Sequence, residues 1–152
     1  MTKEFNPVFL SLSIIEMDDI LRTPYLKQTC LRLSHGRGFG MTRSIECYER
    51  LIQERSVDAT GIFAFYQGKP VGWLLYTYET DCVSFRPWER DNSNEAAAHI
   101  FVAEEWRRLG IGTRLLQMAA KMAEPDTLRV YAHENQSFFQ PIIKQFDSLQ
   151  AI

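Results

Sequence analysis

The segment from Arg107 to Thr113 contains residue types that together can bind an anion. Gly110 and Gly112 let the backbone approach a ligand closely and expose consecutive N–H groups. The sequence after them predicts a helix, whose N-terminus attracts negative charge. Two adjacent arginines add positive charge, and Thr113 adds a hydroxyl, so the segment predicts a pyrophosphate site. The predicted turn consists of Arg107, Arg108, Leu109, Gly110, Ile111, Gly112 and Thr113.

Other phosphate-binding sequences fit this chain less well. There is no G-x-x-x-x-G-K-[ST] sequence, and the turn lacks the third glycine of the dinucleotide-binding fingerprint. The run GRGFG at 36–40 is a second candidate loop, although a linker between two helices explains it more simply. The prediction therefore depends on the order of strand, arginine, spaced glycines and helix, and not on the glycines alone.

Hydrophobic patterns predict the elements that position the turn. Residues 96–102 form a short apolar run typical of a buried strand, and the apolar stripe from Gly112 to Pro125 predicts the helix that follows. Residues 61–66 and 71–78 predict a β-hairpin. The other expected elements are a strand at 8–15, a helix beginning near Thr23 and Pro24, a helix around 45–52, a polar loop at 79–94, a strand at 128–132 and a helix near 137–146.

The turn and its flanking residues resemble the acyl-CoA-binding motif of the GNAT superfamily of N-acetyltransferases, [RQ]-x-x-G-x-[GA] after a strand. Arg107, Gly110 and Gly112 occupy its defining positions. Val102 and Trp106 match the strand end and the aromatic residue that usually precedes the arginine. The likeness is strongest near the turn and weakest over the N-terminal third of the chain.

The resemblance implies an α/β (α+β) fold, GNAT-like, with a mixed, mostly antiparallel central sheet flanked by helices and a shortened C-terminus. Gly72 follows Val71 as a glycine often follows a valine in the family's third strand. Only Ser148 to Ile152 follow the last predicted helix, where family members usually add two strands. A homodimer is one way to complete such a sheet edge. The whole chain, 1–152, is expected to form one domain.

The resemblance also implies acetyl-CoA as the cosubstrate and a primary amine as the acceptor, on a small molecule or a protein. Pantetheine is expected to pair with the free backbone edge at Ile100, Phe101 and Val102, where a backbone N–H polarises the thioester carbonyl. Asn135 matches a family asparagine and is a candidate pantetheine contact. A helix N-cap explains Asn135 equally well.

The sequence leaves the proton-transfer groups open. Glu95 is a candidate general base, one position away from the family's strand glutamate, where this chain has Ala96. His99 and His133 are alternatives, because imidazole exchanges protons near neutral pH. An ordinary surface charge and hydrogen-bonded core histidines are the simpler interpretations of these residues.

The tyrosine that acts as the acid in the family has no counterpart here. Aligning Asn135 with the family's asparagine puts Ile142 at the tyrosine position, and aligning Phe138 and Phe139 with the family's Phe-Tyr pair puts Phe139 there. Neither side chain has a hydroxyl. Either water or another group protonates the leaving thiolate, or the chain is a catalytically weak or inactive module that binds acyl-CoA or another protein.

The composition of the chain excludes several other classes. Its 152 residues, with 45% hydrophobic and 24% charged, are typical of one soluble globular domain. A net charge of −2 provides no broad positive surface for nucleic acid. Three distant cysteines show no metal-binding spacing, and the N-terminus resembles neither a signal peptide nor a membrane-spanning helix. We therefore expect a cytoplasmic protein with no bound metal and no membrane partner.

Overall fold

The computed structural model describes residues 4–28, 59–77, 82–84, 98–124 and 126–151. Within these ranges the strands form one seven-stranded sheet in the order β1-β2-β3-β5-β4-β6-β7. The strands are β1 (Leu10–Glu16), β2 (Ala59–Tyr66), β3 (Lys69–Thr77), β4 (Cys82–Ser84), β5 (Ala98–Val102), β6 (Leu128–Val130) and β7 (Leu149–Ala151). The main helices are α1 (Met17–Arg22), α4 (Ile111–Ala123) and α5 (Gln136–Ile143), with short 3-10 helices η1 (Pro7–Phe9), η3 (Glu104–Trp106) and η4 (Ala132–Glu134).

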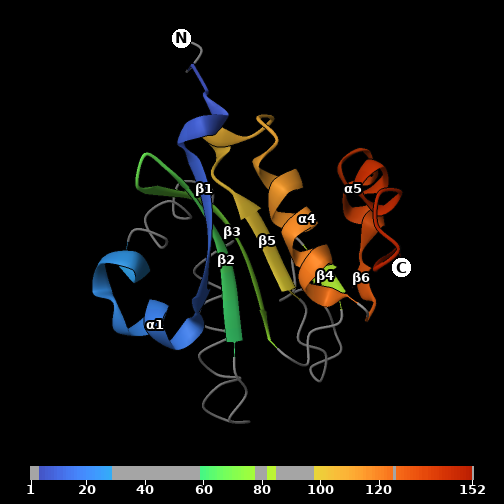
Figure 1. The fold of residues 1–152 in the computed structure, drawn as a ribbon, viewed down its shortest axis with the longest axis horizontal. Coiled ribbons are helices and arrows are strands. Elements are labelled where there is room, and N and C mark those ends of the chain that lie inside the picture. Colours follow the sequence, from blue (N-terminus) through green and yellow to red (C-terminus); the bar gives the residue numbers. More distant parts are fainter. Residues whose placement is uncertain (1–3, 29–58, 78–81, 85–97, 125, 152) are drawn as a thin grey trace.

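Strands β1, β2, β3 and β5 form the antiparallel part of the sheet. The predicted hairpin at β2 and β3 is confirmed, with a tight connection at Gln67 and Gly68. Both residues have positive φ, 49° and 83°, which matches the backbone of the turns that suit the right-handed twist of paired strands. Helix α4 crosses one face of the sheet, and α5 lies beside the C-terminal strands (Figure 1). These features confirm the predicted α/β class, in which helices flank a central sheet.

The second part of the sheet is parallel. Strand β4 pairs with β5 on one side and with β6 on the other, and β6 pairs with β7. The prediction of an unbroken polar loop at 79–94 is wrong at Cys82–Ser84, because these three residues form β4. A three-residue strand is too short to show a hydrophobic period, so its pairing comes from its two neighbours.

Several predicted boundaries shift for local reasons. The strand expected at 8–15 begins only at Leu10, because Asn6 caps η1 by accepting a hydrogen bond from the Val8 N–H at 3.1 Å. Helix α1 follows β1 directly and was not predicted. Residues 24–28 are helical, as predicted after Thr23, while the helix expected around 45–52 lies outside the described residues. The strand expected at 128–132 ends at Val130, because η4 begins at Ala132.

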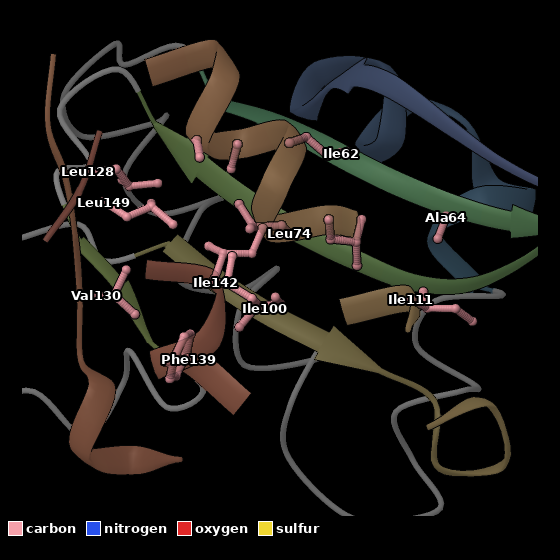
Figure 2. Close-up of a cluster of buried hydrophobic side chains, with 14 of the residues drawn as sticks. Ile62, Ala64, Leu74, Ile100, Ile111, Leu128, Val130, Phe139, Ile142 and Leu149 are labelled. Atoms are coloured by element: carbon pink, nitrogen blue, oxygen red, sulfur yellow. The ribbon is translucent and has the colours of Figure 1, made fainter. Parts of the chain in front are cut away.

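The main core lies between the sheet and α4 and extends to α5. Figure 2 shows Ile62, Leu74 and Ile100, which come from three neighbouring strands, in the same cluster as Phe139 and Ile142 of α5. Each of these five side chains is at most 2% exposed. Burying a side chain of this size contributes about 1.5–3 kcal/mol, so this cluster fixes α4 and α5 against the sheet.

Gly72 on β3 lets the end of β5 and the start of α4 approach closely. A Cβ atom at Gly72 would lie 3.1 Å from the Phe101 carbonyl oxygen, 3.3 Å from Val102 Cγ2 and 3.4 Å from Ile111 Cγ2. The valine–glycine pair noted in the sequence therefore has a steric role, since a larger side chain would push β5 and α4 away from β3.

We expect Gly72→Val to lower the free energy of unfolding by about 1–3 kcal/mol, because the added atoms overpack this contact. For a domain of this size, thermal denaturation should show a melting temperature lower by roughly 2–10 °C. Lys69→Val places the same side chain at an exposed position of β3 and is the matched control. This control should change the melting temperature little. Equal stability of the Gly72 variant and the control would contradict the close approach.

Candidate functional site

The chain turns from β5 into α4 through left-handed backbone. Gly110 is the N-cap residue of α4, with φ 85° and ψ 6°. Arg108 also has a positive φ, 64°, which costs a non-glycine residue about 1–2 kcal/mol. Strain of this kind is concentrated at functional sites, where the surrounding structure holds it in place. A turn that alternates left-handed and ordinary residues can direct successive N–H groups toward one concave face, which is a common way to bind an anion.

The first turn of α4 supplies the donors of this site. The first backbone bond of the helix runs from the Arg114 N–H to the Gly110 carbonyl, at 3.1 Å. The N–H groups of Ile111, Gly112 and Thr113 precede that bond and have no partner in their own helix. A Cβ atom at Gly110 would meet no heavy atom within 4 Å, so there is open space beside the turn. These features fit a pyrophosphate.

Hydrophobic packing holds the turn at both ends. Ile111 is 1% exposed and anchors the start of α4 in the core. On the other side Trp106, the last residue of η3, packs on Tyr66 at the end of β2, with ring centroids 4.7 Å apart. Tyr66 also stacks on Phe5 at 5.3 Å, so residues from three distant segments support the turn. The sequence analysis missed Tyr66, because an aromatic residue at a strand end gives no signal of what it contacts.

The two arginines of the predicted turn differ in their surroundings. The Arg107 Nε donates a hydrogen bond to the Val102 carbonyl at 2.7 Å, and its guanidinium carbon lies 5.3 Å from the centroid of the Phe101 ring. The Arg107 side chain therefore folds back over the end of β5. Arg108 is exposed at the turn itself. Leu109 is half-buried, as is Thr113 in the first turn of α4.

The edge of β5 that faces away from β3 is only partly paired with another strand. Strand β4 pairs with β5 at Ala98 and His99, and among the described strands none pairs with Val102 on that side. The pairing with β4, which lies between β5 and β6, ends at His99, just before the predicted pantetheine edge at Ile100, Phe101 and Val102. The role of these three residues stays a prediction. On the other side of β5, Phe101 stacks on Trp73 of β3, with ring centroids 4.9 Å apart.

Helix α5 borders the same region. A Cβ atom at Gly112 would lie 3.2 Å from two atoms of the Phe138 ring and 3.6 Å from Val102 Cγ2. Asn135 is the N-cap of α5, and its Oδ1 accepts hydrogen bonds from the Phe138 N–H at 3.2 Å and the Ser137 hydroxyl at 3.0 Å. The N-cap interpretation of Asn135 is thus confirmed, and its role as a pantetheine contact stays a prediction.

Among the candidates for proton transfer, His133 is the one whose side chain lies within the described part of the chain. Glu95 lies outside the described residues, and the backbone of His99 pairs with Leu75 of β3 and Ser84 of β4. His133 in η4 is exposed, with its ring edge-on to Tyr131 at 5.9 Å. Both residues that align with the family's tyrosine are buried in the core, Phe139 at 0% exposed and Ile142 at 2%.

The part of the chain that the structure describes has two further properties. Its helices include none long and apolar enough to cross a membrane. Its histidine, cysteine, aspartate and glutamate residues form no group of three or more that could hold a metal ion.

Comparison with known families identifies the family to which the chain belongs. The model of the Acetyltransferase (GNAT) family matches residues 23–140, which include β2, β3, β5, the turn, α4 and the start of α5. The chain belongs to the acetyltransferase (GNAT) family. The resemblance noted in the sequence is thereby confirmed. None of the curated proteins matches the chain.

The solved structures that match the chain include acetyltransferases. A ribosomal-protein-alanine N-acetyltransferase from Brucella melitensis biovar Abortus 2308 is 16% identical, with 94% of this chain and 80% of that chain covered and a TM-score of 0.41. A possible acetyltransferase from Clostridium difficile 630 is 19% identical, with 78% and 73% covered and a TM-score of 0.39. An aminoglycoside acetyltransferase from an uncultured soil metagenomic sample, in complex with sisomicin, is 18% identical, with 95% and 78% covered and a TM-score of 0.41.

Proposed function

We infer that this GNAT family member transfers an acetyl group from acetyl-CoA to a primary amine. The observation that carries the proposal is the left-handed turn between β5 and α4, with its unpaired helix N–H groups and open space at Gly110. A pyrophosphate held there would leave the pantetheine arm directed toward the Val102 end of β5.

Each part of the site has a role in this proposal. The N–H groups of Ile111, Gly112 and Thr113 bind the pyrophosphate, and the exposed Arg108 adds charge. The unpaired edge of β5 near Val102 pairs with pantetheine amides, as an added strand would. A backbone N–H on this edge stabilises the charge that develops on the thioester oxygen.

The reaction needs a neutral amine and two proton transfers. The amine nitrogen forms a bond to the thioester carbonyl carbon, and the carbon–sulfur bond breaks. The amine proton passes to a base, for which Glu95 and His99 remain the candidates. The leaving thiolate takes a proton from water or from another group, since Phe139 and Ile142 have no proton to give. The acceptor itself, a small molecule or a protein, and assembly into a homodimer stay predictions.

We expect Gly110→Val to weaken the binding of acetyl-CoA at least tenfold in calorimetric titration. Valine disfavours the φ of 85° found at this position, and its side chain would fill the open space beside the turn. Gly68→Val is the matched control, because Gly68 also has a positive φ, 83°, and an open Cβ position, but lies in the β2–β3 connection. Both variants should lose similar stability, and only the Gly110 variant should lose affinity. An unchanged affinity would count against the proposed site.

A second candidate function is an acyl-CoA-binding module without catalysis. It is favoured by the burial of Phe139 and Ile142 in the core at the positions where the family has a tyrosine.

Release of free CoA thiol from acetyl-CoA, measured against a panel of amines, separates the two functions. The transferase should release thiol in proportion to the acetylated amine and faster at higher pH, because the neutral fraction of the amine rises with pH. Saturable acetyl-CoA binding without amine-dependent thiol release across the panel would favour the module. Free CoA incubated with the same amines serves as the control for thiol chemistry that needs no acetyl transfer.

A further inference from the structure

The side chain of Arg107 covers backbone that the cofactor is expected to use. The Ala103 N–H donates to the Val71 carbonyl at 2.9 Å, so the backbone groups of Ala103 point toward β3. The Phe101 carbonyl lies on that side too, 3.1 Å from the Cβ position of Gly72. Because backbone groups alternate along a strand, the N–H and carbonyl of Val102 point the other way, toward the open edge.

Arg107 therefore binds the carbonyl that ends this open edge. Its Nε donates to the Val102 carbonyl at 2.7 Å, a short bond for an N–H donor. The guanidinium carbon also lies 5.3 Å from the Phe101 ring, which itself stacks on Trp73. The arginine is held on two sides, by a charge-assisted hydrogen bond and by an aromatic ring.

We propose that Arg107 is a competitor for the pantetheine arm: its side chain occupies the Val102 carbonyl in the free protein and must leave it when CoA binds. This proposal rests on the proposed function, since it assumes that pantetheine pairs with the β5 edge. An open strand edge leaves acceptors that need partners, and Arg107 satisfies one of them until a pantetheine N–H replaces it. The Arg107 side chain thus modulates the affinity for the pantetheine half of the cofactor. The Arg108 side chain modulates the affinity for the nucleotide half.

The test compares two ligands in each variant. Full CoA reaches both the turn and the β5 edge, whereas its nucleotide half, adenosine 3′-phosphate 5′-diphosphate, reaches only the turn. Removing a positive charge weakens the binding of both ligands. The ratio of their dissociation constants therefore isolates the contribution of pantetheine. Arg107→Met should shift this ratio in favour of CoA by about two- to tenfold, which is the range for one exchanged hydrogen bond.

Arg108→Met is the matched control, because it removes the same charge from the neighbouring residue and should leave the ratio unchanged. A ratio that stays constant or moves against CoA in Arg107→Met would overturn the proposal. Absence of CoA binding to the unsubstituted protein would instead overturn the proposed function.

A second measurement uses the unsubstituted protein and so does not depend on how the variant folds. The ¹⁵N resonance of the Arg107 Nε should move when CoA is added, because its bond to the Val102 carbonyl breaks, and should stay in place with the nucleotide half alone. If the Nε resonance does not move at saturating CoA, the hydrogen bond to the Val102 carbonyl persists and the proposal is wrong.

Discussion

The left-handed backbone at Arg108 and Gly110 is the constraint on which the site depends. It reverses the chain between the end of β5 and the start of α4. Ile111, the first residue of α4, is buried. The helix therefore begins next to the strand end and leaves its N–H groups facing open space. The strain at Arg108 is balanced by packing on both sides, from Trp106 on Tyr66 and from Ile111 in the core.

The order of strands decides where a long ligand could lie. Strands β3 and β5 pair from Gly72 to Leu75, which fixes one side of β5. On the other side, β4 pairs with the beginning of β5 and leaves the Val102 end to the Arg107 side chain. The left-handed turn and the Val102 end of β5 are therefore neighbours. Under the proposed function, the turn holds the nucleotide half of CoA and the strand end holds the pantetheine half.

The sequence predicted most of the features that have a strong local signal. The β-hairpin, the buried strand before the turn and the amphipathic helix after it were confirmed, because each has a hydrophobic period or a turn signal of its own. Gly110 was predicted to lie in the turn, but its positive φ was not predicted. The family itself could be predicted from Arg107, Gly110 and Gly112, and the family match confirms it.

Features that depend on distant contacts could not be predicted in this way. Strand β4 is defined by its pairing with β5 and β6, and its three residues show no hydrophobic pattern that predicts a strand. The direction of the Arg107 side chain depends on where the Val102 carbonyl points, which follows from the register of β3 and β5. Asn135 fitted two roles equally in the sequence, and only the hydrogen bonds from Phe138 and Ser137 show that it caps α5.

The most direct test of the central claim is a titration of ¹⁵N-labelled protein with acetyl-CoA, followed at the backbone amides of Ile111, Gly112 and Thr113. If these N–H groups bind the pyrophosphate, their signals should move downfield and saturate at the affinity found by calorimetry. If acetyl-CoA binds while these three amides stay in place and other signals move, the turn between β5 and α4 is not the cofactor site.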